Sequence, residues 1–252
     1  MPIPDLENQL DSSRMVDLEI DDGLAIVTID RPHARNAISL ETMDQLDEAL
    51  GGAVGARALV IKGAGDKAFV SGGDLKELSA IRTESDAAAM AWRMRKVCDR
   101  IAGFPGPVLA ALNGHALGGG AEVAVAADIR IAADDVKIGF NQVTLEIMPA
   151  WGGAERLAAL VGGSQALLLA GTGTILSALE AERVGLIQRV VPRDAFEDEW
   201  RSLARTLAHR AAGEIKRVVR GAPPEEAVAA FARLWVADEH WAAADRVMNR
   251  GK

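Results

Sequence analysis

The 252-residue sequence contains a single cysteine, Cys98, and four histidines. One cysteine cannot form an intramolecular disulfide, and this scarcity suits the reducing cytosol, so we expect a cytoplasmic protein. His33, His115, His209 and His240 lack the spacing of metal ligands, among themselves and with Cys98, so the sequence predicts no metal site. Cys98 itself is expected to face the core of its helix.

Strong charge of one sign and long apolar runs are also missing. The net charge is −8 with both signs spread along the chain, and no basic stripe indicates a nucleic-acid or anionic-lipid partner. The N-terminus shows no basic segment followed by an apolar core, so no signal peptide is expected. Residues 105–127 form the most apolar run, but Asn113, His115, Glu122 and several glycines interrupt it. We therefore expect a buried strand–loop–helix unit there and no membrane span.

What is present is an alternation of strand and helix patterns. Strands are predicted at 17–20, 24–29, 58–61, 108–112 and 129–132. Residues 21–23 form a hairpin-like turn, Ser39 can N-cap a helix, and a longer helix is expected at 85–102. This βαβ alternation predicts the α/β class with mostly parallel strands.

The C-terminal part shows helical spacing only. The sequence therefore predicts an α/β core over residues 1–192, which contains the candidate functional residues described below, and a helical lobe over 193–252. Phe231, Leu234, Trp235 and Trp241 give this lobe more large apolar side chains than a small lobe needs for itself. We expect these side chains to pack against other copies of the chain.

Two glycine-containing stretches lead directly into predicted helices, FVSGGDLKEL at 69–78 and HALGGGAEV at 115–123. A helix N-terminus carries unpaired N–H groups and the positive end of the helix dipole. Glycine lets a ligand approach that backbone closely, and two N–H groups that converge form an oxyanion hole. A tight turn explains either stretch taken alone.

Glu122 gives the two stretches a functional interpretation. It lies between three glycines and an apolar run, one helical turn after Gly119, so both residues can face the same space. A carboxylate beside a polarised carbonyl is what proton removal or delivery at an α-carbon requires. We therefore predict an acid/base group in an apolar wall, where burial raises its pKa.

Several segments resemble, in the right order, the crotonase superfamily of enoyl-CoA hydratases and isomerases. They are RPHARNAIS, KAFVSGGDLKEL, NGHALGGGAEVAVAADIRIAA, IMPAWGGAERL and AERVGLIQRVVP, which together span most of the chain. The resemblance implies a crotonase-like ββα spiral core with a helical C-terminal lobe that packs between the subunits of a homo-trimer or hexamer.

The resemblance also implies a site. The substrate would be an acyl-CoA thioester, with coenzyme A as part of the substrate and no other cofactor, used in fatty-acid or acyl-CoA metabolism. Its carbonyl oxygen would receive the N–H groups of Gly73 and Gly119. Asp74, Leu75 and Lys76 match the neighbouring thioester-binding stretch.

The sequence departs from the hydratase pattern at the second catalytic glutamate. An ungapped alignment on the segment IGFNQVTLEIMP puts Gln142 at that position and Glu146 in place of a glycine. Glutamine can hold a water molecule but cannot take its proton, and losing one acid/base group costs roughly 10²–10⁴ in rate.

A branch of the same superfamily offers a second hypothesis. MPAWGGAERL, with Trp151, and FARLW resemble the ethylmalonyl-CoA decarboxylases, which also lack the second glutamate. Trp151 is a candidate substrate-binding residue, with packing as the alternative. We favour the hydratase/isomerase group, and keep a decarboxylase of malonyl-CoA-type substrates and a catalytically weak acyl-CoA-binding protein as alternatives.

Overall fold

The computed structural model describes residues 14–249, and a six-stranded sheet lies at its centre. The strands, in spatial order, are β1 (Val16–Asp21), β2 (Leu24–Ile29), β3 (Ala58–Gly63), β5 (Val108–Leu112), β7 (Ile129–Ala133) and β10 (Arg189–Val191). β1 runs antiparallel to β2, and all other neighbours are parallel. The predicted α/β class with mostly parallel strands is confirmed, and so is the hairpin, whose turn is narrowed to Asp22 and Gly23.

A second sheet of four short strands was not predicted. Its strands, in spatial order, are β4 (Ala68–Val70), β6 (His115–Leu117), β8 (Lys137–Gly139) and β9 (Ile175–Ser177). β4, β6 and β8 run parallel, and β9 pairs antiparallel with β8. Because one glycine stretch begins within β4 and the other begins with β6, this sheet brings the two stretches together.

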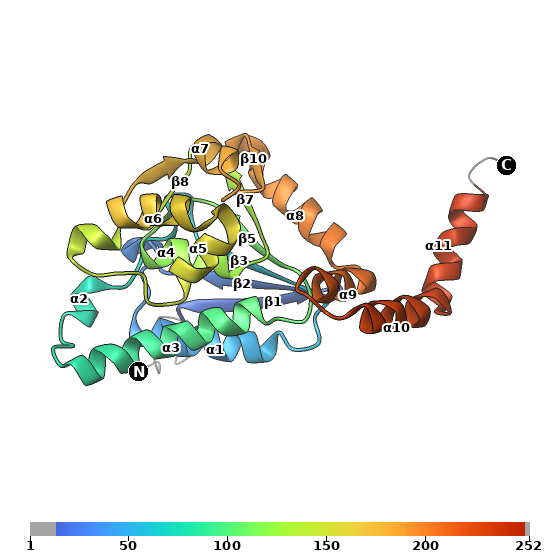
Figure 1. The fold of residues 1–252 in the computed structure, drawn as a ribbon, viewed down its shortest axis with the longest axis horizontal. Coiled ribbons are helices and arrows are strands. Elements are labelled where there is room, and N and C mark those ends of the chain that lie inside the picture. Colours follow the sequence, from blue (N-terminus) through green and yellow to red (C-terminus); the bar gives the residue numbers. More distant parts are fainter. Residues whose placement is uncertain (1–13, 250–252) are drawn as a thin grey trace, which may run out of the picture.

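Helices cover both sheets. They are α1 (Leu40–Gly52), α2 (Leu75–Leu78), α3 (Glu84–Ala102), α4 (Gly119–Ala126), α5 (Gly153–Val161), α6 (Gly163–Thr172) and α7 (Ala178–Arg183), with 3₁₀ segments η2 (Pro32–Ala34), η3 (Asn141–Leu145) and η4 (Arg193–Ala195). Ser39 N-caps α1 as predicted, because its side chain accepts a hydrogen bond from the Thr42 N–H at 3.1 Å. Figure 1 shows α1 and α3 packed side by side below the first strands.

The predicted core position of Cys98 is confirmed. Its side chain lies on the inner face of α3 with Met94, Val97 and Ile101. Burial raises the pKa of the Cys98 thiol far above its ordinary value, so the thiol stays protonated.

The C-terminal part is helical, as predicted. It consists of α8 (Phe196–Leu207), α9 (Arg210–Val219), α10 (Pro224–Trp235) and α11 (Asp238–Met248). Phe196 and Trp200 of α8 belong to the main core, and the Lys216 ammonium of α9 donates to the carbonyls of Phe104 and Gly106. α10 and α11 extend away from the core, at the right of Figure 1. The division at residue 192 stays a prediction.

Between residues 14 and 249, no helix combines the length and apolarity needed to cross a membrane. The expectation about a signal peptide concerns the N-terminal segment, of which residues 1–13 lie outside the described residues.

Candidate active site

Ile38 holds the backbone on both sides of Gly73. The Ile38 N–H donates to the Gly72 carbonyl at 2.9 Å, and the Asp74 N–H donates to the Ile38 carbonyl at 2.9 Å. Successive peptide groups in such a bridge point to opposite sides, so the N–H of Gly73 points away from Ile38. It has no hydrogen-bond acceptor within residues 14–249 and is free to bind a ligand.

The second glycine stretch begins α4. Gly119 is the first residue of this helix, and its N–H has no acceptor in the part of the chain that the structure describes. A Cβ on Gly72 would lie 3.5 Å from the Gly119 nitrogen, so the two stretches are in direct contact. A Cβ on Gly120 would lie 1.8 Å from the Val70 carbonyl oxygen, so only glycine lets α4 begin against β4. The glycines therefore precede Glu122 because the helix that carries it starts against another backbone.

Glu122 lies on the first turn of α4 and is 2% exposed. Its Oε2 accepts hydrogen bonds from the N–H groups of Trp151 at 2.7 Å and Gly153 at 3.0 Å. Its Oε1 accepts from Gln142 Nε2 at 2.9 Å. A Cβ on Gly153 would lie 2.3 Å from Glu122 Cγ, so this contact with the start of α5 requires glycine.

Burial dominates the ionisation of this carboxyl. It raises the pKa of Glu122 to about 7, although the N–H groups of Gly153 and Trp151 and the Gln142 amide stabilise the charged form. The predicted burial and raised pKa of Glu122 are confirmed. Near neutral pH the group exists in both protonation states, which suits general acid and general base chemistry.

Gln142, in η3, is buried beside Glu122. Its Nε2 donates to the carboxylate, whereas its Oε1 is buried without any hydrogen-bond partner among the described residues. A buried acceptor of this kind is costly unless a ligand or water donates to it. Glu146 is exposed and adopts a left-handed backbone conformation with φ of 56°, which favours the glycine of the family pattern.

Trp151 lies directly against the glycine stretches and is 7% exposed. A Cβ on Gly119 would lie 2.1 Å from Cζ3 of the indole, and one on Gly73 would lie 4.0 Å from its Cη2 and Cζ2. The outer edge of the indole therefore contacts both glycines whose N–H groups are free, while the backbone of the same residue binds Glu122. Its assignment as a substrate-binding residue stays a prediction.

Of the three residues after Gly73, Asp74 is held by hydrogen bonds, whereas the next two are exposed to solvent. The Asp74 carboxylate accepts from Arg31 Nη2 at 3.0 Å and N-caps α2 through the Glu77 N–H at 3.4 Å. Burial alone would raise the pKa of Asp74, but the hydrogen bonds from Arg31 and Glu77 outweigh it and hold this pKa below its ordinary value. Leu75 is 60% exposed and Lys76 is exposed. Contact of these residues with a thioester stays a prediction.

Two buried asparagines, to which the sequence alone assigned no role, hold the loop before the first glycine stretch. Asn36 Nδ2 donates to the Ala64 and Ala68 carbonyls at 3.0 and 2.8 Å. Asn113 Nδ2 donates to the Gly65 and Ala68 carbonyls at 2.8 and 3.2 Å. Asn36 stands in the quoted segment RPHARNAIS, and Asn113 directly follows a buried strand. An asparagine next to a buried strand indicates a side chain that holds a neighbouring loop through hydrogen bonds to its backbone.

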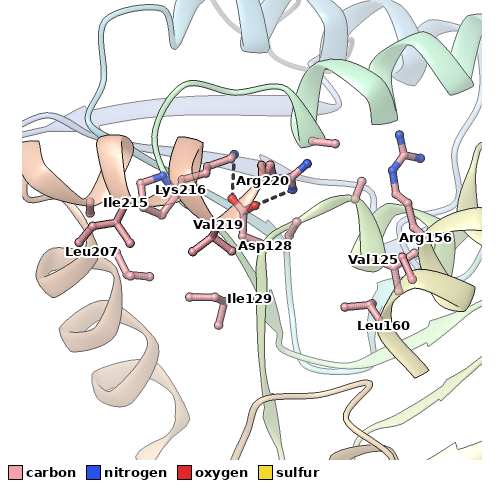
Figure 2. A pocket seen from close by; sticks show the side chains of 16 residues that line it. Val125, Asp128, Ile129, Arg156, Leu160, Leu207, Ile215, Lys216, Val219 and Arg220 are labelled. Carbon is pink, nitrogen blue, oxygen red and sulfur yellow. Dashed lines mark hydrogen bonds and ion pairs between the residues drawn. The ribbon is translucent and has the colours of Figure 1, made fainter. Parts of the chain in front are cut away.

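A cavity of about 550 Å³ lies at the far end of α4, between α5 and α9. Figure 2 shows its apolar walls, which include Val125 and Leu160, and Asp128 paired with Lys216 and Arg220. None of the predicted site residues lines it. Within residues 14–249, no three His, Cys, Asp or Glu side chains come together as a metal site.

The comparison with known proteins decides the family, because the enoyl-CoA hydratase/isomerase family model matches residues 19–222. The chain belongs to the enoyl-CoA hydratase/isomerase family. It is 38% identical over 175 residues to a probable enoyl-CoA hydratase of Bacillus subtilis, which covers 68% of this chain and 67% of that one. It is 36% identical over 202 residues to the short-chain-enoyl-CoA hydratase of Clostridium acetobutylicum, with 79% and 77% covered.

The solved structures confirm the crotonase-like fold. An enoyl-CoA hydratase from Bacillus anthracis superposes with a TM-score of 0.86 at 27% identity, covering 94% of this chain and 97% of that one. The predicted superfamily is confirmed, and the family supports an acyl-CoA substrate. The resemblance to the decarboxylase branch stays a hypothesis.

Proposed function

We propose that this member of the enoyl-CoA hydratase/isomerase family hydrates or isomerises an enoyl-CoA thioester with Glu122 as its one acid/base group. The observation that carries the proposal is the Glu122 carboxyl, buried with a pKa of about 7, one turn after the free N–H of Gly119. The thioester carbonyl oxygen would accept from Gly73 and Gly119, so that negative charge on the enolate oxygen meets two fixed donors.

Hydration by this site requires one proton shuttle. Glu122 takes a proton from water as the water oxygen bonds to the β-carbon, and the resulting enolate charge collects on the thioester oxygen. The protonated Glu122 then delivers the proton to the α-carbon, which restores the carboxylate. In isomerisation the same carboxylate would remove a proton from one carbon of the chain and return it to another.

Gln142 supports the hydration step through its unpaired oxygen. A water molecule that donates one hydrogen to Gln142 Oε1 and the other to the Glu122 carboxylate would satisfy this buried acceptor and present its lone pair to the substrate. A substrate carboxylate in the same place would face the Gln142 oxygen without a hydrogen to share. The orphaned oxygen therefore favours water as the group bound beside Glu122.

Decarboxylation of a malonyl-CoA-type thioester is the second candidate, because Gln142 cannot take a proton and Trp151 matches that branch. Loss of carbon dioxide would leave an enolate at Gly73 and Gly119, and protonated Glu122 would protonate its α-carbon. Only one acid is needed. A catalytically weak acyl-CoA-binding protein is the third candidate and requires only the binding residues.

A paired assay separates the three candidates. Crotonyl-CoA hydration is measured beside carbon dioxide release from methylmalonyl-CoA and ethylmalonyl-CoA, and calorimetry with butyryl-CoA and free CoA reports binding. We expect hydration to dominate, and to rise in Gln142→Glu if the missing acid limits it. Dominant carbon dioxide release with no gain in that variant would identify a decarboxylase, and binding without turnover would identify the third candidate. A protein that binds no CoA thioester would contradict all three.

We also propose a cytoplasmic homo-trimer or hexamer that acts in fatty-acid or acyl-CoA metabolism and needs no cofactor beyond the CoA of its substrate. Phe231, Trp235 and Trp241, exposed on α10 and α11, support the assembly. Asp74, Leu75 and Lys76 are proposed to lie along the thioester, beside the Gly73 N–H.

A further inference from the structure

The indole of Trp151 occupies the space beside both glycines of the proposed oxyanion hole. A Cβ on Gly119 would lie 2.1 Å from Cζ3, 2.5 Å from Cη2 and 2.8 Å from Cε3, so the ring lies on the backbone of α4 at its first residue. The same edge reaches Gly73, where a Cβ would lie 4.0 Å from Cη2 and Cζ2. A group bound to both N–H groups must therefore be a neighbour of this ring.

The backbone of Trp151 is held on both sides. Its N–H donates to Glu122 Oε2 at 2.7 Å, and its carbonyl accepts from Arg156 Nη1 at 3.1 Å. The Arg156 guanidinium is itself paired with Asp99. Since the peptide groups are fixed in this way, space can open at the indole only by rotation of the side chain or by its replacement.

These contacts put the indole beside the start of an acyl chain bound at this site. A thioester carbonyl at Gly73 and Gly119 with its α-carbon at Glu122 would lie against the indole edge, because this edge contacts both glycines and the Trp151 N–H binds Glu122 Oε2. The carbons after the α-carbon leave this point next to the ring. A short acyl group has few atoms there, whereas a long chain needs the volume that the indole fills, and a filled core does not yield that volume freely.

We propose that Trp151 sets the acyl-chain length of this site and restricts it to short acyl groups. The inference rests on the proposed function, since it assumes that the acyl-CoA binds at Gly73, Gly119 and Glu122. Trp151 acts as a specificity-determining residue, and the shape of its ring provides the selection.

The test is a binding series that does not depend on which reaction the protein performs. Calorimetry gives the Kd of butyryl-, octanoyl- and dodecanoyl-CoA for the wild type, Trp151→Ala, Trp151→Leu and Trp151→Phe. In an open apolar site each added methylene strengthens binding, so weaker binding of longer chains marks a steric limit. We expect dodecanoyl-CoA to bind the wild type about tenfold or more weakly than butyryl-CoA, with the order reversed in Trp151→Ala. Trp151→Leu should be intermediate, and Trp151→Phe should stay close to the wild type.

Trp92→Ala is the matched control, because Trp92 lies on α3, is 59% exposed and has its ring against Arg95. Its chain-length preference should equal that of the wild type. Equal preferences in the wild type and the folded Trp151 variants would overturn the inference and leave the proposed function intact. Equal binding of short and long chains by the wild type would also overturn it. Absence of binding for every acyl-CoA, in the wild type and in Trp151→Ala, would instead reject the proposed function together with the inference.

Discussion

At the scale of single residues, Glu122 combines two opposing influences. Three N–H donors, from Trp151, Gly153 and Gln142, stabilise its charged form, while an almost complete loss of contact with water destabilises it. Burial is the larger effect, and the pKa rises from 4.5 to about 7. The donors fix the direction of the carboxylate, and the apolar wall sets its basicity.

The raised pKa gives hydration and decarboxylation opposite pH dependences. Hydration begins with the Glu122 carboxylate, so kcat/KM for crotonyl-CoA should rise with pH through about 7 and then level off. Each decarboxylation turnover ends when the neutral acid delivers a proton to the enolate, so kcat for decarboxylation should fall over the same range. Stopped-flow or spectrophotometric rates between pH 5.5 and 8.5 test this, and a flat hydration profile across pH 7 would contradict the role of Glu122.

The same pKa predicts how stability changes with pH. Between the unfolded value of 4.5 and the folded value of about 7, the folded chain binds more protons at Glu122 than the unfolded chain. The contribution of this group to stability therefore falls as pH rises through that window and stays low above it. In Glu122→Gln the free-energy cost of burying a charged carboxylate disappears. The new amide can donate to Gln142 Oε1 once the Gln142 amide flips.

We expect Glu122→Gln to be more stable than the wild type at pH 8 by on the order of 3 kcal/mol, a gain that fades toward pH 4.5. Urea unfolding at both pH values measures it. Equal stability of the two proteins at pH 8 would show that Glu122 is not held in a costly charged state.

Much of this residue-scale picture could be predicted from the sequence, and part could not. A carboxylate between glycines and an apolar run indicated a buried acid/base group, because such a residue is rarely placed for packing. The donors to Glu122 could not be predicted, since Trp151 and Gly153 are far along the chain and donate through their backbones. A backbone donor leaves no trace in residue type, except that Gly153 has no room for a Cβ.

At the scale of elements, the loop between β4 and α2 allows a clean test of one oxyanion donor. A Cβ on Gly73 would meet only the end of the Leu78 side chain, at 2.9 Å, and the tip of Trp151 at 4.0 Å. Gly73→Ala keeps the N–H and should stay within about tenfold of wild-type kcat, whereas Gly73→Pro removes the N–H and should lose about 10²–10³. Circular dichroism and thermal unfolding confirm that both variants fold.

Equal kcat values for these two variants would reject Gly73 as an oxyanion donor. The corresponding change at Gly119 is less informative, because any Cβ there would lie 2.1 Å from the Trp151 ring. Gly119→Pro would remove an N–H and displace the indole at the same time.

The elements also show why part of the fold escaped prediction. The strands of the large sheet have five or six residues, apart from β10, and their apolar patterns were sufficient to predict most of them. The strands of the small sheet have three residues each, too few for an alternating pattern to stand out from a loop. Their pairing depends on segments that are distant in the chain, and it is this sheet that joins the two glycine stretches.

At the scale of the whole molecule, α10 and α11 carry a group of exposed aromatic side chains. The rings of Phe231, Trp235, His240 and Trp241 contact one another, and Phe231, Trp235 and Trp241 are 61, 47 and 46% exposed. We expect these side chains to be buried between copies of the chain of 26.6 kDa, so that sedimentation velocity gives a trimer or a hexamer at micromolar concentration. The double variant Phe231→Glu, Trp235→Glu should dissociate. A monomeric wild type would contradict the proposed assembly.

The order of the segments along the chain was enough to predict the fold class and the superfamily, because both follow from local motifs. The position of α10 and α11 relative to the core was not predictable, because helical spacing indicates that a helix has an apolar face but not which surface packs against it.

In the proposed reaction Gly73 and Gly119 stabilise a thioester enolate, and Glu122 exchanges the α-proton. Butyryl-CoA has α-protons but no double bond to hydrate and no carboxylate to lose, so it isolates this step from either reaction. We expect the wild type to exchange the α-protons of butyryl-CoA with deuterium from solvent, followed by NMR, and Glu122→Gln to slow this exchange about 10²-fold or more. Bound butyryl-CoA that keeps its α-protons, or exchange at the same rate in both proteins, would contradict the account.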